Sequence, residues 1–194
     1  YRESLEITRA ADGEDSLEIP VTLMNLGGIY RDKGEFAKAE PLLEDALARD
    51  RKFFLSPNVA LVRDMTSLAQ TKTGLKKYSE AEALLKEATA ALGKTGVPPD
   101  HRAYADVQDV YAAVLLKTGR VDEARSVIET ALRTFAAKPT IRAGFEKLHA
   151  SLPSQFRVFR PSREKNDSIS ALYGVAGCGR PETSADAKRR APWN

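Results

Sequence analysis

A helical-hairpin pattern that repeats along the chain restricts its fold more than any other feature. The pattern is clearest at residues 23–47, where two apolar stripes with three- and four-residue steps lie on either side of a short turn. Ala39 recurs as Ala81, 42 residues later, and as Ala124, 43 residues after that. A nearly fixed step is typical of an array in which each hairpin buries its apolar face only against its neighbours.

The composition agrees with a helical chain. Ala, Leu, Glu, Lys and Arg, all strong helix formers, are abundant, and the β-branched and aromatic runs expected of strands are missing. We therefore expect an all-α fold, an α-solenoid of antiparallel helical hairpins with a capping helix and a largely disordered C-terminal tail.

The expected array covers residues 1–152, and residues 153–194 form a low-order basic tail. Within the array we expect the second helix of a truncated repeat at 1–12, complete hairpins at 20–50, 60–93 and 102–135, and a capping helix at 138–152.

The second hairpin departs from the pattern at its turn. Gly74 lies two residues earlier than Gly34 would predict, and Lys72 takes the place of Tyr30. Its first helix is therefore expected to end early or to pack less tightly. In the first hairpin Pro41 is expected to bend the second helix rather than break it.

Small residues recur where the two helices of a hairpin must approach closely. They are Gly27, Ala69 and Ala112 on the first helices and Ala39, Ala81 and Ala124 on the second. A small side chain at these positions lets two backbones come close.

The segment NLGGIYRDKGEFAKAEPLLEDAL resembles a tetratricopeptide repeat. The landmarks of that repeat fall on Leu26, Gly27, Tyr30, Gly34, Phe36, Ala39 and Ala46. The 42-residue step resembles the kinesin light chain type of the repeat, which also occurs in bacterial regulatory proteins. The resemblance covers residues 1 to about 135 and implies a superhelix whose first helices line a concave groove.

Helical geometry then assigns side chains to that groove. The partner-binding candidates are Asn25, Arg31, Arg63, Ser67, Gln70, Asp106 and Asp109, and Gly28, Asp32, Thr73 and Ala113 share their face. Asn25 is the best single candidate, because a primary amide both donates to and accepts from a peptide backbone. With basic residues towards one end and acidic residues towards the other, the groove predicts a ligand of opposite polarity.

No constellation of reactive residues indicates an enzyme. His101 and His149 lie on different elements and Cys178 is alone, so neither a metal site nor a catalytic set is indicated. We expect no catalytic residue, no cofactor, no metal and no small-molecule substrate.

Charge and hydropathy restrict the remaining partners. The net charge is only +3, and the basic excess lies in the tail, so nucleic acid is disfavoured as a partner. No apolar run approaches the roughly 20 residues of a membrane span, so no membrane partner is expected. One cysteine allows no intrachain disulfide, which favours a cytoplasmic location.

These observations leave two functional hypotheses open. The first is a protein–protein interaction scaffold that binds a peptide or helix of a partner in the groove. The alternative is a regulatory or sensing segment of a larger, truncated signalling enzyme, such as a bacterial Ser/Thr kinase. Because Tyr1, Leu5 and Ile7 would lack a partner helix, we also expect the N-terminal segment either to fray or to self-associate through its exposed face.

Overall fold

The computed structural model describes residues 1–13 and 16–157, and this part of the chain is all-helical, without strands. Residues 14–15 and 158–194, which hold most of the predicted tail with Cys178, lie outside the described residues. The described helices are α1 (Arg2–Asp12), α2 (Glu18–Asp32), α3 (Phe36–Phe53), α4 (Val59–Gly74), α5 (Tyr78–Thr95), α6 (Arg102–Lys117), α7 (Val121–Thr134) and α8 (Pro139–Ser151), followed by the short 3₁₀ helix η1 (Ser154–Phe156).

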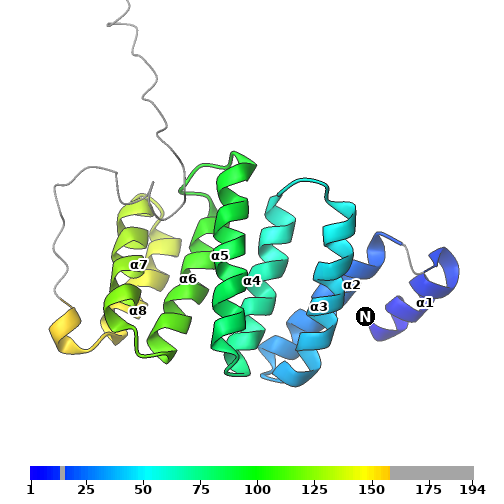
Figure 1. The fold of residues 1–194 in the computed structure, drawn as a ribbon, viewed down its shortest axis with the longest axis horizontal. Coiled ribbons are helices and arrows are strands. Elements are labelled where there is room, and N and C mark those ends of the chain that lie inside the picture. The colour runs from blue at the N-terminus through cyan, green and yellow to red at the C-terminus, as the bar shows by residue number, and fades with distance from the viewer. Residues whose placement is uncertain (14–15, 158–194) are drawn as a thin grey trace, which may run out of the picture. The chain divides into compact units, whose positions relative to one another are not determined.

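The helices pack in chain order. Each helix from α1 to α7 contacts the next, and neighbouring helices run in opposite directions (Figure 1). Contacts also join α2 to α4, α4 to α6 and α6 to α8, so the first helices of successive hairpins form a layer of their own. This arrangement confirms the predicted α-solenoid of antiparallel hairpins.

Local signals in the sequence explain where several helices begin. The Asn58 side chain accepts a hydrogen bond from the Leu61 backbone N–H at 2.9 Å and so caps α4. Pro139 opens α8, where its missing N–H costs nothing. Within α3 the helix continues through Pro41, so this proline does not break it.

Close contact between the two helices of each hairpin rests on the small residues. Ala39, Ala81 and Ala124 have no exposed surface, and neither do Ala69 and Ala112. A Cβ atom added to Gly27 would lie 2.6 Å from a methyl carbon of Leu43, much closer than real Cβ atoms approach. The alanines and this glycine therefore set the distance between the helices.

The turn of the second hairpin keeps the geometry of the others. The expectation that its first helix ends early is wrong, because α4 ends at Gly74, in register with the end of α2 at Asp32. Lys76, with φ of 62°, takes the left-handed position that Gly34 and Gly119 occupy at 76° and 77°. The turn thus tolerates a non-glycine residue in a strained conformation.

Gly74 has a packing role rather than a turn role. A Cβ atom at this position would lie 2.6 Å from the Phe36 ring. The glycine therefore makes room for an aromatic side chain of the preceding hairpin.

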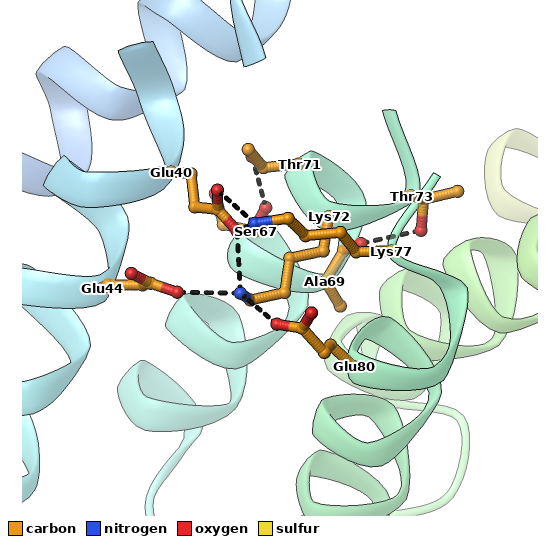
Figure 2. A network of polar contacts seen from close by, with 9 residues as sticks. All are labelled: Glu40, Glu44, Ser67, Ala69, Thr71, Lys72, Thr73, Lys77 and Glu80. Carbon is orange, nitrogen blue, oxygen red and sulfur yellow. Dashed lines mark hydrogen bonds and ion pairs between the residues drawn. The ribbon is translucent and has the colours of Figure 1, made fainter. Parts of the chain in front are cut away.

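Lys72 packs tightly, so the expectation of looser packing is also wrong. Its side chain is only 7% exposed, and its Nζ atom donates to Glu40 and Glu44 of α3 and to Glu80 of α5 at 2.7–2.8 Å (Figure 2). Burial alone would lower the pKa of Lys72, but the three carboxylates together raise it above its ordinary value. Lys77 also donates to Glu40 at 2.8 Å. This charged cluster joins three consecutive helices.

The last hairpin is covered by α8. Phe145 of α8 is buried and stacks on Phe135, which follows α7, with ring centroids 6.0 Å apart and planes 4° from parallel. Leu152 is also fully buried. These apolar groups close the end of the described array.

Enlarging a small residue at the helix–helix contact should destabilise the fold. Ala88 of α5 has no exposed surface, so Ala88→Leu is expected to lower the free energy of unfolding by roughly 1–3 kcal/mol through overpacking. Ala90→Leu on the exposed side of the same helix is the matched control, expected to change it by less than about 0.5 kcal/mol. Urea denaturation measures both, and equal effects would contradict the packing argument.

Candidate functional site

A cavity of about 740 Å³ follows the face made by α2, α4 and α6. It is lined by residues that recur at helical spacing on these three helices. All seven residues that the sequence assigned to partner binding lie in its wall, namely Asn25, Arg31, Arg63, Ser67, Gln70, Asp106 and Asp109. We call this cavity the groove. Its lining is a structural finding, whereas partner binding by these residues stays a prediction.

Most of the assigned side chains are open to solvent, but two are not. Ser67 is buried and Arg31 is half-buried, and the Arg31 Nη1 atom donates to the Ser67 hydroxyl at 2.5 Å. Arg31 also pairs with Asp32 at 2.9 Å. Arg31 therefore links α2 to α4 across the floor of the groove, and part of its hydrogen-bonding capacity is already used.

Two residues on the same predicted face do not line the groove. Thr73 is buried, and its hydroxyl donates to the Ala69 carbonyl at 2.7 Å. Ala113 lies one turn beyond the end of the lining segment of α6. The groove is therefore confined to the N-terminal part of α6.

Arg63 and Asp109 are the charged side chains best placed to meet a ligand. The Arg63 side chain is 67% exposed, and its Nε atom lies 3.5 Å from the neighbouring Asp64. Asp109 is exposed and forms no hydrogen bond or ion pair with any described residue. Although the residue is exposed, partial desolvation of its carboxylate by the surrounding protein, followed by the nearby negative charge of Asp106, raises the pKa of Asp109. A cation from a ligand would relieve this unfavourable field.

Asp106 differs from Asp109 because it already has a partner. The Arg102 Nε atom donates to the Asp106 carboxylate at 2.7 Å, and both residues are exposed on the surface of the first turns of α6. An exposed pair of this kind contributes little stability and exchanges partners readily.

Sequence reasoning missed the end of the groove at the helix N-termini. Val21, Val59 and Arg102 line it there, each four residues before a predicted residue. One more helical turn of the same stripe would have found all three, because residues four apart share a face. His101, which the sequence did not assign to the groove, also lines it, and its Nδ1 atom accepts a hydrogen bond from the Ala103 N–H at 3.2 Å.

Metal-binding clusters and membrane-spanning helices are absent from the described part of the chain. In residues 1–13 and 16–157, no group of three or more His, Cys, Asp or Glu side chains could hold a metal ion. No helix among the same residues combines the length and the apolar character that a membrane crossing requires.

The fold and the groove together define a helical-repeat scaffold. A sequence model of the family described as tetratricopeptide repeat matches residues 1–52 and 18–94. The match confirms the predicted tetratricopeptide repeats over residues 1–94. Repeats of this family generally mediate protein–protein interaction, and the family is typically non-catalytic. No curated protein matches the chain.

Arg31 and Arg63, both in the wall of the groove, should respond differently to substitution. Arg31→Met removes a part-buried hydrogen bond between two helices, and we expect the free energy of unfolding to fall by about 1–2 kcal/mol. Arg63→Met removes an exposed side chain, so the expected change is below about 0.5 kcal/mol. Urea denaturation of both variants measures the difference. An effect of Arg63→Met as large as that of Arg31→Met would contradict these roles.

Proposed function

We propose that residues 1–152 form a protein-interaction scaffold whose groove binds an extended or helical segment of a partner protein. The observation that carries this proposal is the gathering of polar side chains from α2, α4 and α6 in the wall of one cavity. The general role of tetratricopeptide repeats supports it.

The proposed ligand has an acidic side chain at one position and a basic side chain at another. Arg63 on α4 would receive the acidic group, because its guanidinium is exposed and has only a long contact to Asp64. Asp109 on α6 would receive the basic group, which would relieve the raised pKa of this carboxyl. Asn25 on α2 would bond the ligand backbone through its amide.

Charge reversal in the groove tests this function. The full chain is used to select binders from a peptide display library, with Arg63→Glu and Asp109→Lys as variants. We expect the selected peptides to carry an acidic and a basic side chain at a fixed spacing. Each variant should weaken their binding by roughly tenfold or more, because a charge-assisted hydrogen bond contributes about 1.5–3 kcal/mol.

Matched control variants separate the groove from charge in general. Lys52→Glu on α3 and Asp122→Lys on α7 reverse exposed charges that do not line the groove. Both should bind the selected peptides like the unmodified chain. If they lose binding as strongly as the groove variants, or if no variant loses it, the groove is not the binding site.

Self-association is a second proposal, and the exposed apolar side chains near the N-terminus favour it. Tyr1 and Ile7 of the α1 region are 58% and 60% exposed, and Leu17 before α2 is 65% exposed. A second copy of the chain could bury these groups.

A concentration series in sedimentation velocity measures this self-association. Ile7→Lys is expected to shift the chain towards monomer, because it places charge in the apolar contact. Leu55→Lys is the control, since Leu55 is 99% exposed in the loop between α3 and α4. A chain that stays monomeric at all concentrations would rule out this interface.

A further inference from the structure

Two buried acidic residues, one on each helix, interact where α3 meets α4. Asp64 of α4 has no exposed surface, and Asp50 of α3 is buried nearly as deeply. Neither carboxyl oxygen of Asp64 accepts a hydrogen bond from any donor among the described residues. An ionised carboxylate without a donor is costly in such a place, so the pair needs a proton between its two groups.

The nearby cations only partly offset the negative charge of the pair. Arg63 forms a long ion pair with Asp64 at 3.5 Å, and its side chain is largely exposed. The arginines that flank Asp50 contact other residues, since Arg49 pairs with Asp45 at 2.8 Å and Arg51 with Glu87 at 2.7 Å.

The charged groups on the other described helices that pack against α4 form no hydrogen bond with Asp64. Arg31 of α2 bonds Ser67, Glu80 of α5 bonds Lys72, and Asp106 and Asp109 of α6 lie on the groove side. The pKa of Asp64 is therefore set chiefly by its own burial and by Asp50, which both raise it, and by Arg63, which lowers it. Together, burial and Asp50 raise the pKa of Asp64 to about 7.

The array itself shows that the fold does not require acids at this place. The repeat register aligns three pairs of buried residues, one at each junction between consecutive hairpins. They are Thr8 and Thr22 at the α1–α2 junction, Asp50 and Asp64 at α3–α4, and Leu92 and Val107 at α5–α6. All six side chains are buried, but only the middle pair can gain or lose a proton.

We propose that Asp50 and Asp64 form a proton-operated latch between α3 and α4. A hydrogen bond through one shared proton holds the junction closed, and release of that proton to solvent loosens it. The latch does not require a ligand in the groove.

The direction of the pH effect follows from proton linkage. In the closed junction Asp64 holds its proton up to about pH 7, whereas an opened junction exposes the Asp64 carboxyl, which then loses its proton near the ordinary value of 3.8. Between these values the closed form binds one more proton, so opening becomes easier by about tenfold for each pH unit of increase. Above about pH 7 both forms are ionised, and the effect levels off.

Hydrogen exchange on the full chain tests the latch. Amide protection at the α3–α4 junction is compared at pH 5, 6, 7 and 8 after correction for the intrinsic exchange rate. We expect opening to rise by roughly tenfold per unit from pH 5 to about pH 7 and then to stay level. The α5–α6 junction, which has Leu92 and Val107, is the reference within the same molecule.

Two variants provide the controls. Asp50→Leu with Asp64→Val copies the α5–α6 pair, and Asp64→Asn keeps a hydrogen-bond donor but cannot ionise. Both should remove the pH dependence of opening and leave the junction more protected at pH 7 than in the unmodified chain. If either folded variant keeps the original pH dependence, the proposal is overturned.

A measurement on the unmodified chain makes the test independent of the variants. The ¹³C shift of the Asp64 carboxyl carbon reports its titration directly. A midpoint between pH 6 and 8 supports the latch. Titration of both carboxyls below pH 5 would overturn it.

Discussion

The structure depends on how closely the two helices of each hairpin approach each other. Ala39, Ala81 and Ala124 have no exposed surface, and a side chain at Gly27 would collide with Leu43. This close contact fixes the position of the second helix of each hairpin relative to the first helix. The first helices are then held in a layer of their own, and the groove follows their common face. The shape of the groove therefore rests on residues that do not line it.

An array with contacts only between neighbours tolerates different chemistry at equivalent positions. The position held by Tyr30 in the first hairpin is held by the buried Lys72 in the second and by Leu115 in the third. Lys72 is accepted because α3 and α5 supply three carboxylates to it. The same part of the array also holds the acid pair of Asp50 and Asp64. Buried charge is thus concentrated around α4, whereas the equivalent pair at the α5–α6 junction, Leu92 and Val107, is apolar.

The sequence predicted what depends on local periodicity and missed what depends on distant partners. Its repeat register was sufficient to identify the hairpins and to place seven side chains in the wall of one cavity. Lys72 could not be interpreted in this way, because Glu40 lies 32 residues earlier and no local pattern marks it as a partner. Gly74 was similarly mistaken for the turn residue, since only the folded chain brings it against Phe36. The acid pair was missed because aspartates on helices usually face solvent.

The adjacency of Arg63 and Asp64 connects the groove to the interior. Successive helical residues point about 100° apart, so one lies in the groove and the other faces α3. Arg63 lowers the pKa of Asp64, against the larger effects of burial and Asp50. An anionic group that engages Arg63 from the groove would weaken this influence and favour proton uptake by the pair. Because linkage is reciprocal, a bound proton would strengthen anion binding at Arg63 by the same free energy. Protonation of the latch would therefore strengthen the binding of an acidic group at Arg63, but not the binding of a basic group at Asp109.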